Sequence, residues 1–561
     1  MYNLKYMKIT IFIYSIVIAC CSSLFFSSCY DDKSTLATNF IDEVVIDTTG
    51  IKQEQFIGYQ ELLTIEPTIT VGGSDGESRL QYEWALAYFS KSDSEFEVIS
   101  TDKRFSEVIS RPISSAPYTL KLTVTDTAND NLQYLCLWNV YVQSSFLDGL
   151  LISDTKDGAS SDLTLILNNH LTVNYDKEEK VYRQILEKAN GDPYNKLMTA
   201  LTYEKFGNAL IAGSGVNQVW AITSDGDCIR FNNQDFTING TSDDESIITY
   251  KPAGLEFKSL FRAYQMFFAY TTAGFYSFMN VSVNSFGWYD AVMTGYSPDN
   301  DVIAATSSSS VYYNHTVWLD QLKGAFYSYS GSASFGASVG QYQANMVFDP
   351  NAMADQTAVA AGIKEDGSIA TFLLKEKSSG SYAIYTLGQY REAEGFYDDD
   401  WNWTETAPST PASARNKYVI PIEGKALLDD AVSIFFAQRE NVLYVVTESG
   451  IYTILYGSGD TAVVSTTAKY TPAAGETITS AKLFQQGHQT NDNATTTGTP
   501  PLITPLEWDN KAIIFTTQKG DNEGKVYVMP ISQAGIGTLD PSNALSYDGF
   551  GRILDVITIG Y

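Results

Sequence analysis

Aromatic and acidic side chains crowd into one segment of this sequence, GFYDDDWNWTETAPSTP, which spans residues 395–411. The segment contains Tyr397, Asp399, Trp401 and Trp403. Exposed aromatic rings can stack on sugar rings or hold apolar peptide side chains, and carboxylates accept hydroxyl and amine donors or bind calcium. These four residues therefore form the candidate ligand-binding site. The alternative is a long loop that folds onto its own aromatic side chains.

Residues that would carry out covalent or metal chemistry are sparse. The three histidines, His170, His315 and His488, lie in unrelated contexts, and the sequence has no nucleophile elbow, HExxH helix, phosphate-binding loop or dinucleotide fingerprint. We therefore expect a non-enzymatic protein with no catalytic residue, metal or cofactor. The acidic segments 153–162 and 241–246 could bind calcium, but neither has EF-hand spacing. A glycoside hydrolase remains an alternative, because 65 acidic residues offer many carboxylate pairs.

The five cysteines do not indicate a disulfide framework or a zinc site. Cys136 and Cys228 lie far apart in unrelated segments, and no CxxC motif or cysteine–histidine cluster occurs. The other three, Cys20, Cys21 and Cys29, lie near the N-terminus. The fold is therefore expected to be stabilised by its hydrophobic core alone.

The beginning of the sequence has the pattern of a secretory signal. Lys5 and Lys8 are followed by the apolar run ITIFIYSIVIA. FSSC, at residues 26–29, resembles the lipobox of bacterial lipoproteins, although Phe26 stands where leucine is usual. VIAC, which ends at Cys20, is an alternative lipobox, but cleavage there would leave the apolar stretch SSLFF exposed.

The lipobox resemblance implies that Cys29 is lipidated and carries fatty acyl chains such as palmitate. The acidic stretch YDDK that follows resembles the signal that exports Bacteroidetes lipoproteins to the outer face of the outer membrane. We therefore expect a lipoprotein signal peptide at 1–28 and a lipidated tether at 29–39. Acyl chains can anchor a large body, since each buried CH₂ contributes about 0.8 kcal/mol.

The composition indicates a folded, strand-rich protein. At 561 residues the chain is expected to form more than one domain, and its hydrophobic fraction of 44% is that of a globular protein. The 37 tyrosines and 29 phenylalanines favour strands, so we predict an all-β fold. The formal net charge of −29 disfavours nucleic acid and anionic lipid as partners, because both are polyanions.

Residues 40–145 have the short alternating strands of a β-sandwich. In YTLKLTVTD, residues 118–126, apolar and polar side chains alternate, as in a half-buried strand. The turn cluster DTANDN separates it from LQYLCLWNVYV, which we expect to return as a more fully buried strand. Upstream, LQYEWALAY places Trp84 in a third strand, as a core aromatic of the sandwich.

These strands, together with VISTDKRFSEVI and FLDGLLISD, resemble the PKD-like domain of Bacteroidetes surface lipoproteins. The resemblance extends from the lipid anchor to about residue 166. It implies an immunoglobulin-like sandwich that serves as a spacer near the membrane.

One pattern recurs through residues 146–561: an apolar strand, a polar turn with glycine, and a second strand. Glycines at 226, 274, 324, 367 and 450 are expected to supply a positive φ at the bends. Because a lone hairpin cannot bury both faces, we predict a β-propeller of about seven blades. Two stacked β domains are the alternative. The hairpins occur at 149–166, 219–231, 267–278, 317–329, 359–374, 443–454 and 513–529.

The best helical candidate is EEKVYRQILEKAN, residues 178–190, with Val181, Ile185 and Leu186 on one face. We expect it to lie between the first two hairpins.

The lipoprotein resemblance implies an accessory role beside a SusC/SusD-type (RagA/RagB-like) TonB-dependent importer. In that role the protein would capture oligopeptides or oligosaccharides, or brace the complex, alongside the transporter subunits and other surface lipoproteins. A structural spacer or adhesin is an alternative. The choice between peptide and glycan as cargo stays open, because the acidic surface favours cationic peptides whereas Trp401 and Trp403 favour sugars.

Overall fold

The computed structural model describes most of residues 43–559. Contacts divide the chain into two compact units. Unit 1 contains most of the chain up to Tyr141, and unit 2 contains Val142–Tyr561 with two short upstream segments. Among the described residues, no helix is long and apolar enough to span a membrane. The gaps in the described range are 60, 73–75, 89–95, 112–115, 144–145, 147–148, 173–174, 176, 206–216, 233–234, 244–246, 249–250, 264–265, 280–293, 306–315, 330–334, 339–341, 391–392, 398–400 and 486–505.

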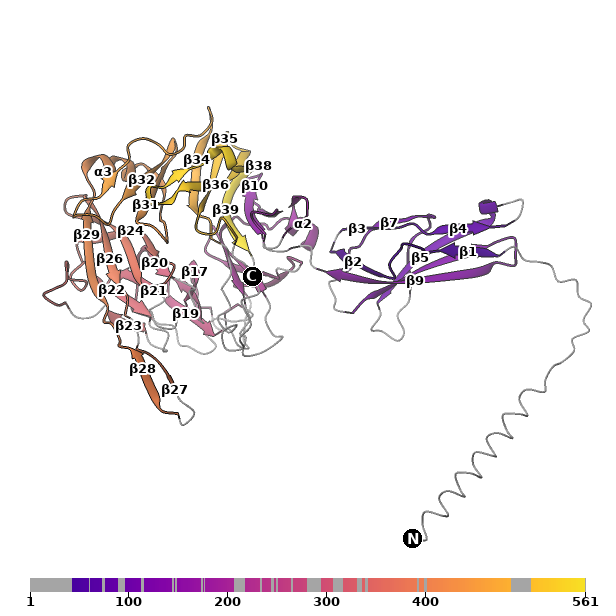
Figure 1. The fold of residues 1–561 in the computed structure, drawn as a ribbon, viewed down its shortest axis with the longest axis horizontal. Coiled ribbons are helices and arrows are strands. Elements are labelled where there is room, and N and C mark those ends of the chain that lie inside the picture. The colour runs from indigo at the N-terminus through magenta and orange to yellow at the C-terminus, as the bar shows by residue number, and fades with distance from the viewer. Residues whose placement is uncertain are drawn as a thin grey trace, which may run out of the picture. The chain divides into compact units, whose positions relative to one another are not determined.

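Unit 1 consists of antiparallel sheets (Figure 1). Its five-stranded sheet has the order β2 (Glu54–Gly58), β9 (Leu132–Gln143), β8 (Tyr118–Asp126), β5 (Leu80–Tyr88) and β6 (Glu97–Ser100). Two strand pairs accompany it: β1 (Val44–Asp47) with β4 (Thr68–Val71), and β3 (Leu62–Ile65) with β7 (Phe105–Val108). The predicted hairpin of 118–142 is confirmed as β8–β9.

Trp84 forms the centre of the unit 1 core, as predicted. Its side chain is fully buried, and its ring centroid lies 5.1 Å from that of Phe105 and 5.4 Å from that of Trp138. Its indole nitrogen donates a 2.9 Å hydrogen bond to the carbonyl oxygen of Asp102, so the one polar atom of the ring keeps a partner.

The prediction that β9 is the more fully buried strand is wrong for its first half. Leu135 is 62% exposed and Leu137 is 50% exposed. Both lie on the outer face, opposite Thr123 and Lys121 of β8, whereas Trp138 begins the inward series. The period of two therefore persists through an apolar run, and leucines occupy the solvent face.

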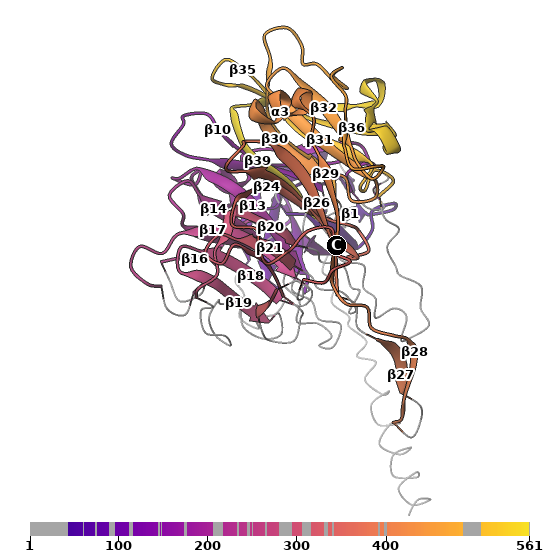
Figure 2. The same cartoon turned by 90° about the vertical axis from the view of Figure 1, so that its left-hand side faces the viewer.

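In the described residues, unit 2 is built from antiparallel sheets of three to five strands that follow one another along the chain, except that the last strand joins the first sheet; a two-stranded sheet is also present (Figures 1 and 2). Each of the predicted hairpins is confirmed as a pair of neighbouring strands. Within the described residues, the first sheet contains, in order of pairing, β39 (Arg552–Ile559) as its first strand, then β10 (Gly149–Thr155), β11 (Asp162–Leu167) and β12 (Lys180–Tyr182). The next three sheets are β13 (Met198–Lys205), β14 (Asn217–Thr223), β15 (Cys228–Asn232) and β16 (Ile238–Thr241); β17 (Phe257–Ala263), β18 (Met266–Thr271) and β19 (Gly274–Met279); and β20 (Pro298–Ala305), β21 (Thr316–Asp320), β22 (Ala325–Tyr329) and β23 (Phe335–Ser338). The last three are β24 (Gln356–Ile363), β25 (Ile369–Glu376), β26 (Tyr382–Gly388) and β29 (Ser413–Val419); β30 (Ala431–Phe436), β31 (Val442–Thr447), β32 (Gly450–Leu455) and β33 (Val463–Val464); and β34 (Thr477–Leu483), β35 (Ala512–Lys519), β36 (Glu523–Gln533) and β38 (Leu545–Phe550), with β37 (Thr538–Leu539) also paired to β36.

The first strand of each sheet contacts the first strand of the next: β39 contacts β13, and the contacts continue through β17, β20, β24 and β30 to β34. Buried apolar side chains fill the space between consecutive sheets. Leu165 and Met198 belong to one such cluster, and the rings of Phe326 and Phe372 meet at 4.9 Å in another. A further cluster joins the last sheet to the first through Ile514 and Ile152. This arrangement is propeller-like.

The prediction of a positive φ fails at one of the five hairpin glycines. Gly226 has φ +80°, and positive values also occur at the glycines of 274, 324 and 367 but not at Gly450. A Cβ atom at Gly450 would lie 3.0 Å from the carbonyl oxygen of Tyr470. This glycine therefore permits a close backbone approach rather than a left-handed turn.

The predicted helix of 178–190 is half wrong. Its first part is the edge strand β12, where Val181 is 38% exposed, and only Ile185–Asn190 forms the helix α2. Ile185 and Leu186 are buried, as expected. The backbone of Gln184 has φ +55°, a left-handed conformation that interrupts the helical pattern between the two elements.

Asp555 of β39 forms hydrogen bonds with both neighbouring first strands, β13 and β34. Its carboxylate accepts hydrogen bonds from the backbone nitrogen of Leu201 in β13, at 2.7 Å, and from the ammonium of Lys482 in β34, at 2.6 Å. The Asp555 side chain is only 15% exposed, so these bonds are poorly screened by water.

Replacement of Asp555 by alanine should therefore destabilise unit 2. It leaves the Leu201 N–H without its acceptor, and we expect a loss of about 1–3 kcal/mol in the free energy of unfolding. Urea unfolding followed by tryptophan fluorescence measures the change. Glu523→Ala, which removes an exposed carboxylate at the start of β36, serves as the control and should change stability little. Equal stability of Asp555→Ala and the wild type would show that this carboxylate does not link the strands.

Candidate functional site

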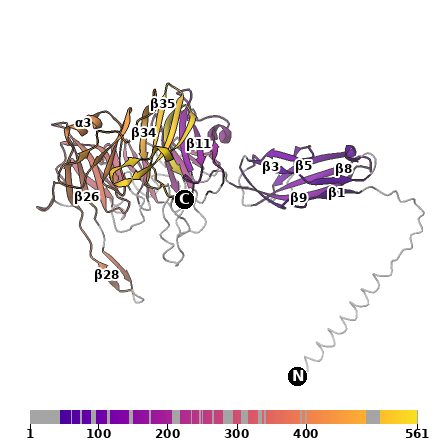
Figure 3. The ribbon, with the colours of Figure 1, turned by 45° about the horizontal axis from the view of Figure 1, so that its top comes forward.

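The aromatic segment of 395–411 is a hairpin rather than a long loop. β27 (Glu394–Tyr397) pairs with β28 (Trp403–Ala407), and the backbone of Tyr397 lies opposite that of Trp403. The hairpin is inserted between β26 and β29, which pair directly with each other. Figures 1, 2 and 3 show it extending away from the other sheets of unit 2.

The aromatic side chains of this hairpin are exposed. Trp401 is 81% exposed, Phe396 is 56% exposed and Trp403 is 46% exposed. An ideal Cβ at Gly395 would lie 2.4 Å from the Trp403 ring, so only glycine leaves space for this indole across the hairpin. Trp401 has φ +62°, an uncommon conformation for a bulky residue. The hairpin therefore presents aromatic surface to solvent.

The structure describes the predicted site residues only in part. Trp401 and Trp403 lie together on the hairpin, and Tyr397 contributes its backbone to β27. Asp399 and Cys29 lie outside the described residues. Of the histidines, His170 stacks on Trp508 with ring centroids 4.3 Å apart, whereas His315 and His488 also lie outside the described part. Cys136 and Cys228 are not in a disulfide.

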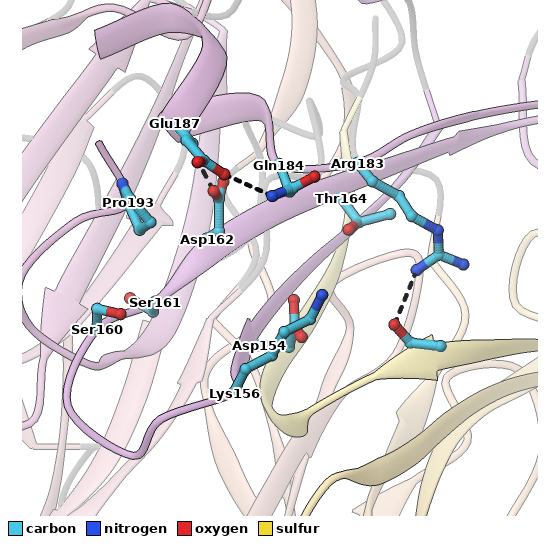
Figure 4. A pocket seen from close by; sticks show the side chains of 11 residues that line it. Asp154, Lys156, Ser160, Ser161, Asp162, Thr164, Arg183, Gln184, Glu187 and Pro193 are labelled. Atoms are coloured by element: carbon cyan, nitrogen blue, oxygen red, sulfur yellow. Dashed lines mark hydrogen bonds between the residues drawn. The ribbon is translucent and has the colours of Figure 1, made fainter. Parts of the chain in front are cut away.

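A second candidate site, which the sequence analysis missed, is a polar pocket in the first sheet of unit 2 (Figure 4). Its volume is about 90 Å³. The pocket brings together the β10–β11 turn, the start of α2 and the turn before β39. Its lining residues are Asp154, Lys156, Ser160, Ser161, Asp162, Thr164, Arg183, Gln184, Glu187, Pro193 and Gly549. The only sequence signal was the acidic stretch SDTKDGASSD, which we interpreted as a surface turn.

Asp154 is the most buried acid of the pocket, with 7% of its surface exposed. One oxygen accepts a 2.8 Å hydrogen bond from the backbone nitrogen of Gly551. Burial raises the pKa of Asp154, although the Gly551 hydrogen bond and the charges of Lys156 and Arg183 act in the opposite direction. Desolvation of the carboxylate therefore outweighs its stabilising contacts.

The other acids of the pocket have structural partners. Asp162 accepts hydrogen bonds from the backbone nitrogens of Leu163, Leu186 and Glu187, and so holds the first turn of α2 against β11. Burial nevertheless raises the pKa of Asp162. One oxygen of Glu187 accepts a hydrogen bond from the side-chain amide of Gln184 at 2.5 Å.

The β10–β11 turn is fixed by Asp157. Its carboxylate accepts hydrogen bonds from the backbone nitrogens of Ala159 and Ser160, both at 2.8 Å, and from the Ser160 hydroxyl at 2.7 Å. These bonds, the one from the Ser160 backbone first, hold the pKa of Asp157 well below its usual range. The turn is therefore ordered without a ligand.

Arg183 closes the opposite side of the pocket. Its guanidinium donates hydrogen bonds to the carbonyl oxygens of Asp548, at 2.7 Å, and Gly549, at 3.3 Å, and lies 4.9 Å from the centroid of the Phe550 ring. Within the described residues, no group of three or more histidine, cysteine, aspartate or glutamate side chains could hold a metal ion.

The opposite pKa shifts of Asp154 and Asp157 predict opposite pH dependences. Asp154→Asn should be at least as stable as the wild type at neutral pH, because the folded wild type then holds a poorly solvated charge. Folded Asp154 keeps its proton at pH values where the unfolded chain, with a pKa of about 3.9, has released it. The wild type therefore loses stability as pH rises through the raised pKa, and the advantage of Asp154→Asn grows with it.

Asp157→Asn provides the contrast. Because the folded pKa of Asp157 is lowered, its contribution is present above the unfolded pKa and is lost as pH falls through the folded value. This variant should be less stable at neutral pH, with the deficit shrinking in acid. Thermal unfolding of Asp154→Asn between pH 3 and 8, and of Asp157→Asn from pH 8 into acid well below the unfolded pKa of about 3.9, measures the two effects. A neutral-pH loss of stability in Asp154→Asn would contradict the prediction.

The comparisons with known proteins bear mainly on the first part of the chain. The model of the PKD-like family matches residues 29–196, in agreement with the resemblance noted in the sequence. No curated protein matches the chain.

Several solved structures are similar at low sequence identity. Hsv2 of Kluyveromyces lactis is 7% identical with a TM-score of 0.30, and the match covers 72% of this chain and 98% of that one. Apo AztD from Citrobacter koseri is 10% identical with a TM-score of 0.33, covering 86% and 98%. BBS1N, in complex with ARL6DN, is 9% identical with a TM-score of 0.33, covering 70% and 100%.

TM-scores of this size do not establish a shared fold, so the propeller-like description of unit 2 depends on its own sheet topology. The chain is an all-β protein in which residues 29–196 are similar to the PKD-like family.

Proposed function

We propose that this protein is a lipid-anchored, non-enzymatic accessory subunit of a SusC/SusD-type importer on the outer face of a bacterial outer membrane. It captures oligopeptides or oligosaccharides for the TonB-dependent transporter. The observation that carries the proposal is the aromatic hairpin β27–β28, on which Trp401 and Trp403 are exposed. A cluster of exposed aromatic groups can mark a ligand-binding or protein-interaction surface.

The anchor is inferred from the sequence around Cys29. FSSC followed by YDDK fits a lipidated cysteine and surface export. Attachment of the binder and the importer to one membrane raises their effective concentration, so that weak direct contacts suffice for ligand transfer.

We further infer that unit 2 is a closed β-propeller of seven blades. The order of the sheets along the chain, the contacts between successive first strands and the apolar cluster that joins the last sheet to the first support this inference. Such a body would hold the hairpin at a fixed position, because the sheets that support it are packed on both faces.

The hairpin can be tested by replacing Trp401 and Trp403 with alanine. Each aromatic contact contributes about 0.5–1.5 kcal/mol, so the double variant should raise the Kd of a hairpin-bound ligand by about tenfold. Calorimetry against panels of oligopeptides and oligosaccharides measures the change. Leu322→Ala, which removes a side chain 69% exposed on another turn, is the matched control. An unchanged Kd would leave the hairpin without a role in ligand capture.

The importer association is tested by affinity purification from native outer membranes. We expect SusC- and SusD-type subunits to be recovered with the wild-type protein, and radiolabelled palmitate to enter the wild type but not Cys29→Ser. Added protease should also digest the wild-type protein on intact cells. Recovery without any transporter subunit would contradict the accessory role, and turnover of a polysaccharide or peptide by the purified protein would favour a hydrolase.

A further inference from the structure

The polar pocket of Figure 4 contains hydrogen-bonding groups that the fold does not use. Within the described residues, only one of the two Asp154 oxygens has a hydrogen-bond partner, the Gly551 nitrogen. The hydroxyl of Thr164, a residue 3% exposed, has none. Both oxygens belong to largely buried residues but are accessible from the pocket, where water or a ligand group can pair with them.

The walls around these two groups are fixed by the protein. Asp157 orders the β10–β11 turn, Ser161 accepts a 3.1 Å hydrogen bond from the Met198 nitrogen, and Asp162 holds the first turn of α2. Arg183 is held by the carbonyl oxygens beside Gly549. Ligand binding would therefore cost little ordering of the site.

The lining carries charges of both signs, which disfavours a ligand with a single type of charge. Lys156 and Arg183 would repel a cation that approaches Asp154, whereas Asp154, Asp162 and Glu187 would repel an anion. A neutral ligand with several hydroxyl groups avoids both penalties. Each hydroxyl can donate to a carboxylate and also accept from an ammonium or a threonine hydroxyl.

The size of the pocket restricts how much of a ligand can enter. The pocket is small, with a volume of about 90 Å³, and it is open to solvent on one side. A hydroxymethyl group and adjacent ring hydroxyls fit this space, but a whole oligosaccharide does not. The pocket is therefore suited to the terminal unit of a longer chain.

We propose that this pocket binds the end of a neutral saccharide, with Asp154 accepting and Thr164 exchanging hydrogen bonds with its hydroxyl groups. Lys156 is exposed, and its ammonium, which has no hydrogen-bond partner among the described residues, donates to a sugar oxygen at the mouth. This inference rests on the proposed capture of external nutrients and names glycan rather than peptide as the cargo, but it requires neither the hairpin nor the importer.

The test is calorimetric titration of the full purified protein with neutral sugars: the methyl glycosides of glucose, galactose and mannose, and maltotriose. Trilysine and glucuronate are the cationic and anionic comparisons. We expect at least one neutral sugar to saturate a single site, and Asp154→Asn and Thr164→Val each to raise its Kd at least tenfold. Asp366→Asn, at the exposed turn between β24 and β25, should leave the Kd unchanged.

Folding of the variants is checked by thermal unfolding, since Thr164→Val keeps the side-chain shape and Asp154→Asn keeps an acceptor for the Gly551 nitrogen. No saturable binding by any sugar, or equal Kd values in both pocket variants and the wild type, would overturn the proposal. So would preferential binding of trilysine or glucuronate with the same dependence on Asp154. If importer subunits are not recovered but the protein binds sugar in an Asp154-dependent way, the accessory role is rejected and this binding site is retained.

Discussion

The structure of unit 2 depends on the pairing of its last strand with one of its first. β39 runs antiparallel to β10, from Gly149 opposite Ile559 to Thr155 opposite Arg552. Each sheet of the unit is apolar on both faces, so a simple row of sheets would leave two open faces at its ends. The pairing places strands from the beginning and the end of unit 2 in one sheet, and the cluster that contains Ile152 and Ile514 then buries the remaining faces.

The polar groups near this junction are constrained by the same pairing. Asp555 joins β39 to its neighbours β13 and β34, and Asp154 accepts a hydrogen bond from the Gly551 nitrogen at the turn where β39 begins. A Cβ at Gly551 would lie 2.0 Å from the carbonyl oxygen of Thr155, so the chain needs glycine where it approaches β10. The pocket is a consequence of this approach, because Gly549 supplies the wall opposite the β10–β11 turn.

The two candidate sites differ in how much of the fold they involve. The hairpin β27–β28 is an insertion between β26 and β29, and those strands pair without it, so its aromatic residues can serve binding alone. The pocket, by contrast, uses residues that also hold α2 and the β10–β11 turn. Changes in the hairpin should therefore affect ligand contacts more than stability, whereas changes in the pocket affect both.

Local structure could be predicted from the sequence alone. The all-β class, each hairpin and the core position of Trp84 were predicted, because alternation of apolar side chains and turn residues is a local signal. The sequence did not predict the solvent-facing Leu135 or the end of the helical pattern at Gln184, where sheet register and a left-handed backbone override the pattern. It placed Trp401 and Trp403 together, since they are neighbours in the chain. Only the tertiary structure brought Asp154 against Gly551, because strand pairing between segments some 400 residues apart leaves no periodic trace in either one.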